Sequence, residues 1–235
     1  MIRTVLSQVA ARLLHAMSAA VLPLRCACCD AVLEWQEGEW CGPCAFALRR
    51  QRGMNLNRFR SRLGPLRTWS WISPGAKGME RQAVHRLKYG GGPQLGPALG
   101  QAMAKEAPRE WWPKKERWAV VPIPLHRRKQ RRRGYNQSAL LAEGWCDVMG
   151  MDVVTALVRT QHRRSLTRLA RRERLHSLTD AYRLNPDCTL NTSDLDGLIL
   201  FDDVITTGAT MEAAWSALRS AWDGPIDLIT LMDAA

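Results

Sequence analysis

Short apolar runs alternate with amphipathic stretches from about residue 66 to the end of the chain. Five segments have the continuous or alternating apolar pattern of strands: residues 66–72, 118–121, 153–158, 198–201 and 226–231. Four segments repeat apolar positions at helical spacing: residues 76–87, 95–106, 136–149 and 209–218. This alternation predicts an α/β domain with a mainly parallel sheet flanked by helices.

The beginning of the chain has a different pattern. Residues 1–20 predict an amphipathic helix, because Arg12 and His15 interrupt the apolar run that a signal peptide would need. Residues 22–50 are rich in cysteine, and the polar residues that follow read as a linker. We therefore expect a helix and a metal module in 1–50, a linker in 51–65, and the α/β domain in 66–235.

Four of the seven cysteines form two Cys-x-x-Cys pairs, Cys26 with Cys29 and Cys41 with Cys44. Eleven residues separate the pairs, which is enough for a hairpin to bring them together, and Gly42-Pro43 favours a turn. This spacing predicts one structural Zn²⁺ in a zinc ribbon, since four thiolates leave no open position for catalysis. Cys28 would be a spare thiol. The alternatives are buried free cysteines or a redox pair.

The cysteine usage also bears on the compartment. Seven oddly spaced cysteines are not a disulfide framework, and thiolate metal sites are typical of a reducing environment. No apolar run approaches the length of a membrane span. We therefore expect a cytoplasmic protein.

The charge is strongly basic, with 34 Lys and Arg against 22 Asp and Glu, a net charge of +12. Six basic residues lie within seven positions: Arg127, Arg128, Lys129, Arg131, Arg132 and Arg133. More arginines follow between Arg159 and Arg174. Such surfaces attract nucleic acid, pyrophosphate or anionic lipid, although a solvated basic face would have the same composition.

Residues 197–210 are the most informative stretch. A continuous apolar run, as in a strand buried on both faces, is followed by Asp202 and Asp203. A turn and the start of a helix come next: Thr206, Thr207, Gly208, Ala209 and Thr210. Ionised carboxylates accept hydrogen bonds from a diol such as that of ribose, and free amides at a helix start suit a phosphate. The simpler alternative is a strand, a turn and a capped helix.

These fourteen residues resemble the phosphoribosyl-pyrophosphate signature of type I phosphoribosyltransferases. The stretch Val121-Pro-Ile-Pro-Leu-His-Arg-Arg-Lys-Gln-Arg-Arg-Arg-Gly-Tyr-Asn-Gln137 and the cysteine cluster narrow the resemblance to the ComF (GntX-like) family, which is linked to competence and DNA uptake. The resemblance implies a type I phosphoribosyltransferase fold behind a zinc ribbon. It also implies a pyrophosphate-binding loop at residues 125–129, with His126, Arg127, Arg128 and Lys129.

By this resemblance the protein transfers phosphoribose from phosphoribosyl pyrophosphate, bound with Mg²⁺, to an unidentified nitrogenous acceptor. Asp202 and Asp203 would hold the ribose hydroxyls, directly or through Mg²⁺. Residues 159–180 take the place of the mobile hood of such enzymes, but Leu166 and Ser177 stand where relatives usually have Gln and Asn.

That departure and the basic charge favour a second hypothesis, an accessory factor of natural transformation that kept the fold and binds single-stranded DNA. A third is a scaffold that docks a competence helicase through the zinc ribbon. The tryptophan pairs Trp69/Trp71 and Trp111/Trp112 could stack on bases, but core packing is the better interpretation.

Overall fold

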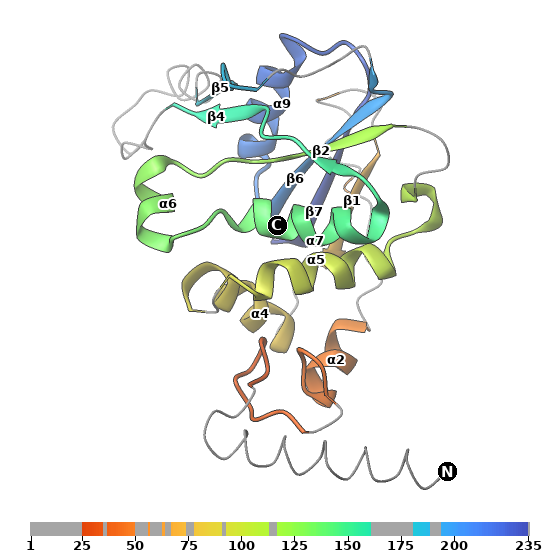
Figure 1. Cartoon of the computed structure of the whole chain (residues 1–235), viewed down its shortest axis with the longest axis vertical. Coiled ribbons are helices and arrows are strands. Elements are labelled where there is room, and N and C mark those ends of the chain that lie inside the picture. Colours follow the sequence, from red (N-terminus) through yellow and green to blue (C-terminus); the bar gives the residue numbers. More distant parts are fainter. Residues whose placement is uncertain are drawn as a thin grey trace, which may run out of the picture.

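A five-stranded parallel sheet forms the centre of the chain, with strand order β1-β7-β6-β2-β3 (Figure 1). The computed structural model describes residues 25–34, 37–49, 56, 63, 67–73, 78–90, 93–112, 117–160, 181–188 and 194–234. The sheet strands are β1 (Thr68–Ile72), β2 (Trp118–Pro122), β3 (Asp152–Val153), β6 (Gly197–Ile205) and β7 (Ile226–Asp233). The predicted fold class, a mainly parallel α/β sheet consistent with the type I phosphoribosyltransferase fold, is confirmed.

Helices cover both faces of this sheet. One face packs against α4 (Met79–Tyr89), α5 (Leu95–Glu106) and α7 (Gln137–Met149). The other face packs against α9 (Ala209–Arg219) and a two-stranded antiparallel ribbon, β4 (Leu157–Arg159) with β5 (Tyr182–Leu184). Three shorter elements complete the described part of the chain: α2 (Gly42–Arg49), the 3-10 turn η2 (Arg109–Trp111) and α6 (Arg127–Arg133).

The two faces of β6 show why its apolar run is continuous. Ile199 and Phe201 pack into the core under α5 and α7, whereas Leu198 and Leu200 pack into the core under α9. Successive side chains of a strand point to opposite faces, so a strand covered on both sides needs apolar residues at every position. The ring of Trp145 on α7 lies 5.8 Å from that of Phe201.

Helices α5 and α7 approach each other closely through glycines. A Cβ placed on Gly144 would lie 2.0 Å from the carbonyl oxygen of Pro97, and one on Gly100 would lie 2.1 Å from that of Leu141. Because these neighbours are backbone atoms, they cannot move aside as a flexible side chain would. The absence of a side chain therefore sets the distance between the two helices.

The structure corrects several local predictions, two of which concern the fold. Residues 153–158 do not form one strand: after β3, Ala156 N–H donates to the carbonyl of Val154, and the chain turns away to pair with β5. Gly42 and Pro43 do not form a turn but begin α2, where proline is tolerated because first-turn amides have no helical partner. The predicted helix at 1–20, the hood segment with Leu166 and Ser177, and most of the linker at 51–65 lie outside the described residues.

Candidate functional site

The adjacent carboxylates lie near the carboxyl end of β6. We expected the strand to end before them, but it continues to Ile205, and Asp202 pairs in register with Thr230 of β7. The segment after β2 lies next to this point, because Ile123 N–H donates to the carbonyl of Phe201 at 2.9 Å. Open α/β sheets bind ligands outside the carboxyl ends of their strands, and this is the edge where both segments meet.

Asp202 is almost fully buried, with 8% of its surface exposed. Ser138 in the first turn of α7 donates its hydroxyl to Oδ1 at 2.8 Å, and the backbone N–H of Asp203 donates to the same oxygen at 2.8 Å. Burial raises the pKa of Asp202 to about 7, and repulsion from Asp203 is the second largest cause of the rise. The two hydrogen bonds and the charge of Lys88 act in the opposite direction. A cation at this carboxylate would favour its ionised form.

Asp203 has a different partner. Its Oδ2 lies 3.4 Å from Nζ of Lys88, which belongs to the last turn of α4. Both side chains are largely covered, with 14% of Asp203 and 23% of Lys88 exposed. The ion pair therefore joins the carboxyl end of β6 to α4, a contact that the sequence does not predict.

The loop after β6 has the conformation expected for a strand-to-helix turn. Gly208 adopts the left-handed conformation (φ 82°) at the N-cap of α9, a conformation that glycine takes without strain. Thr206 and Thr207 are exposed, and Ala209 and Thr210 are the first residues of the helix. Because Gly208 has no side chain to cap α9, the backbone amides in the first turn of α9 can bind an anion.

The segment proposed to bind pyrophosphate is a helix start and not a loop. His126 is the N-cap of α6, and its Nδ1 accepts a hydrogen bond from the backbone N–H of Arg128 at 3.1 Å. Arg127, Arg128 and Lys129 are exposed residues of its first turn. Arg, Lys and Gln favour helix, and Gly134 ends it in the left-handed conformation (φ 83°), which explains the difference.

Asn136 lies at the start of α7 and contacts the segment after β2. It occupies the N-cap position of α7, but its side chain makes no capping hydrogen bond. Instead its Nδ2 donates to the carbonyl of Ile123 at 3.1 Å. Asn136 therefore fixes the segment between β2 and α6 against the start of α7.

The four paired cysteines come together as predicted. The Sγ atoms of four cysteines all lie within 4.8 Å of one another: Cys26, Cys29, Cys41 and Cys44. Tetrahedral coordination at the usual Zn–S length places sulfurs about 3.8 Å apart, so the cluster fits a metal ion of this kind. The four cysteines are thus positioned to bind a metal.

Hydrogen bonds favour the thiolate of Cys26, whereas burial raises the pKa of Cys41 and of Cys44 in the same cluster. Burial alone raises the pKa of Cys26, but hydrogen bonds from the backbone N–H groups of Cys29, Cys41 and Cys28 outweigh it and lower the pKa to about 7. The Cys28 thiol points elsewhere, donating to the carbonyl of Met79 at 3.0 Å, and burial raises its pKa to about 11. These observations agree with its interpretation as a spare thiol.

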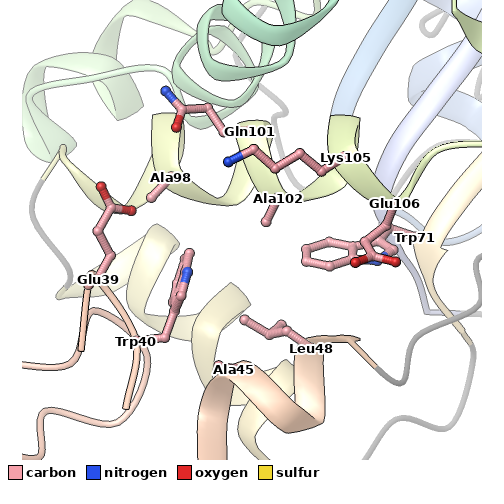
Figure 2. A pocket seen from close by; sticks show the side chains of 11 residues that line it. Glu39, Trp40, Ala45, Leu48, Trp71, Ala98, Gln101, Ala102, Lys105 and Glu106 are labelled. Atoms are coloured by element: carbon pink, nitrogen blue, oxygen red, sulfur yellow. The ribbon is translucent and has the colours of Figure 1, made fainter. Parts of the chain in front are cut away.

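The cysteine module contacts α4 closely and α5 loosely. Cys28 and Cys44 both reach Met79 at the start of α4, whereas a cleft of about 470 Å³ separates the module from α5. Figure 2 shows Trp40 and Leu48 on the module side of this cleft and Ala98 and Ala102 on the other. The module is therefore supported mainly by α4.

Sequence reasoning missed Lys88 and Ser138 as partners of the carboxylates. Ser138 directly follows the Arg-Gly-Tyr-Asn-Gln pattern, which gave a weak signal, but Lys88 stood in a helix with no marked feature. The roles assigned to Asp202, Asp203, residues 206–210 and residues 126–129 remain predictions.

The fold is a parallel α/β sheet flanked by helices, consistent with a type I phosphoribosyltransferase-like fold. No protein-family model matches the chain. It is 33% identical over 104 residues to Competence protein F of Haemophilus influenzae, covering 43% of this chain and 44% of the relative. It is also 33% identical over 148 residues to DNA utilization protein YhgH of Salmonella typhi, covering 58% of this chain and 60% of the relative.

The chain thus matches about half the length of these curated relatives. Their names confirm the predicted kinship with competence proteins, and the cysteine cluster is compatible with the predicted zinc ribbon. Among the described helices, none has the length and apolarity that crossing a bilayer requires.

Proposed function

We propose that the chain is a phosphoribosyltransferase that binds phosphoribosyl pyrophosphate with Mg²⁺ and transfers phosphoribose to a nitrogenous acceptor in DNA uptake or DNA utilisation. The main support is the carboxyl end of β6, which brings Asp202 and Asp203 and the start of α9 to one edge of a parallel sheet. The names of the two relatives support the DNA context.

In this proposal Asp202 and Asp203 accept hydrogen bonds from the ribose hydroxyls or hold Mg²⁺, for which carboxylates are suitable ligands. Residues 206–210 hold the 5-phosphate, and Arg127 and Arg128 contact the pyrophosphate. The acceptor nitrogen forms a bond to C1 while the bond from C1 to the pyrophosphate oxygen breaks, and the electron pair leaves with pyrophosphate. Mg²⁺, when bound, neutralises charge on that leaving group.

Calorimetric titration with phosphoribosyl pyrophosphate and Mg²⁺ tests the proposal. Asp203→Asn should weaken binding at least tenfold while the melting temperature stays close to that of the wild type. The matched control is Asp147→Asn, which removes an exposed carboxylate from α7. Unchanged binding in the Asp202→Asn/Asp203→Asn double variant would exclude the proposed role of the pair.

We assign structural Zn²⁺ to Cys26, Cys29, Cys41 and Cys44, on the strength of the mutual Sγ distances. A thiolate site needs reduced cysteines, so a cytoplasmic location suits the proposal.

A second candidate function, binding of single-stranded DNA, is favoured by α6. Six of its seven residues are basic, and all except Arg133 are exposed. Such a helix attracts the phosphates of a strand, and each neutralised phosphate would contribute about −0.7 to the slope of log affinity against log salt. Measuring the affinity for an oligo-dT strand across a salt series tests this: a steep slope supports it, and a flat slope rejects it.

A further inference from the structure

The carboxyl ends of α4 and α6 enclose an open cavity of about 890 Å³. Among the residues that the structure describes, eight line it: Lys88, Tyr89, Gly90, Pro93, Arg132, Arg133, Gly134 and Tyr135. Three of these are cationic, two are tyrosines, and none is acidic. The lining therefore combines positive charge with aromatic surface.

Tyr89 is the aromatic surface that a ligand can reach. It is 62% exposed, and the guanidinium of Arg133 stacks on its ring at 5.1 Å from the centroid. The exposed ring of His85, one helical turn earlier on α4, lies 5.0 Å from the ring of Tyr89. Exposed aromatic rings with neighbouring arginine are the usual platform for an unpaired base.

The walls of the cavity are held in place. The hydroxyl of Tyr135 donates to the carbonyl of Leu87 at 2.9 Å, which joins the chain after α6 to the end of α4. Gly134 ends α6 in the left-handed conformation and leads directly into Tyr135. The charged and aromatic groups are therefore presented by two connected helix ends.

We propose that this cavity binds one nucleotide of a single nucleic-acid strand, with the base stacked on Tyr89 and the phosphate contacted by Arg132. The proposal rests on the second candidate function and adds to it the place where a base is held. A strand fits better than a free nucleotide because α6 carries four further basic residues beyond the cavity lining. This helix is about 10 Å long, so its charges reach the phosphates of neighbouring nucleotides.

Anisotropy of a fluorescent dT12 strand with the full chain tests the proposal. Tyr89→Ala should weaken binding about tenfold and Tyr89→Phe less than twofold, because stacking needs the ring and not the hydroxyl. The salt slope should be the same in both variants, since neither changes a charge. Trp112→Ala is the matched control, because Trp112 is a 40% exposed aromatic residue away from the cavity lining.

Competition experiments distinguish a nucleic-acid strand from a free nucleotide or pyrophosphate as the ligand of the cavity. Thymidine monophosphate or pyrophosphate should displace dT12 only at far higher concentration than unlabelled dT12. Equal losses in Tyr89→Ala and Trp112→Ala, or pyrophosphate competing as well as the strand, would overturn the proposal. The affinity for phosphoribosyl pyrophosphate, measured by calorimetry, should be unchanged in Tyr89→Ala. A failure of the strand proposal can therefore be distinguished from a failure of the phosphoribosyltransferase proposal.

Discussion

The ammonium of Lys88 lies 3.4 Å from Oδ2 of Asp203, so the last turn of α4 neutralises one of the two adjacent carboxylates of β6. A divalent cation that binds Asp203 must compete with this ammonium. Lys88→Met should therefore tighten binding of Mg²⁺ alone by roughly fivefold, the equivalent of about 1 kcal/mol for a partly exposed ion pair.

Titration calorimetry with MgCl₂ measures this change. Lys105→Met removes the same charge from α5, where the lysine lines the cleft of Figure 2, and should leave Mg²⁺ affinity unaltered. Weaker Mg²⁺ binding in Lys88→Met would show that Lys88 does not compete for Asp203.

The pKa of Asp202 predicts a pH dependence of stability. Burial raises this pKa from 3.8 to about 7, so between these values the folded protein keeps a proton that the unfolded chain loses. The free energy of unfolding should therefore fall as the pH rises from about 4 to about 7, by at most roughly 1.4 kcal/mol for each pH unit. Urea denaturation at pH 5 and pH 8 measures the difference, which should be smaller in Asp202→Asn. An equal difference in the variant would assign the effect to other groups.

The exposed charges of α6 predict the salt response of strand binding. Arg131→Ala/Arg132→Ala should reduce the salt slope by roughly one to two units, because two phosphate contacts are lost. Binding of phosphoribosyl pyrophosphate should be largely retained, since Arg127 and Arg128 remain. Arg109→Ala/Arg183→Ala removes two exposed arginines elsewhere and serves as the control. A similar decrease in both double variants would mean that net charge alone sets the slope.

The cysteine cluster predicts one metal ion per chain. Metal analysis of the purified protein should find zinc at a stoichiometry near one, and Cys41→Ser should lose it because only three thiolates remain. Cys28→Ser should retain the metal, since the Cys28 thiol contacts Met79 instead. Zinc loss in Cys28→Ser, or a disulfide among the four cysteines under reducing conditions, would contradict the assignment.

The close contact of α5 with α7 predicts that Gly144→Ala is destabilising. The new methyl group would lie 2.0 Å from the carbonyl oxygen of Pro97, so the helices must separate. We expect a loss of about 1–3 kcal/mol in the free energy of unfolding, as for overpacked cores. Gly38→Ala is a suitable control, because a methyl group there meets no atom within 4 Å. A loss below about 1 kcal/mol would mean that the helices adjust easily.

The features of this molecule that depend on residues close together in the sequence could be predicted. Both ends of α5 agree with the apolar periodicity of residues 95–106, and the spacing of Cys26, Cys29, Cys41 and Cys44 predicted their cluster. The partners of the carboxylates could not be predicted, because Ser138 and Asp202 are 64 residues apart and meet only through the sheet. The tryptophan pairs suggest base stacking from the sequence, but Trp69, Trp71 and Trp111 are buried. Among the described residues, the exposed aromatic ring stacked with an arginine is that of Tyr89.

Helix α4 joins two chemically different parts of the protein. Its first residue, Met79, contacts Cys28 and Cys44, and its last two residues, Lys88 and Tyr89, contact Asp203 and Arg133. The helix has 11 residues, so these contacts are about 14 Å apart along its axis. In the proposed zinc-bound form, an oxidant that expels the metal would loosen one end of this helix and thereby misplace the lysine and tyrosine at the other. Ligand binding at the proposed sites should consequently depend on the redox state of the surroundings, although no cysteine lines the cavity or pairs with Asp203 among the described residues.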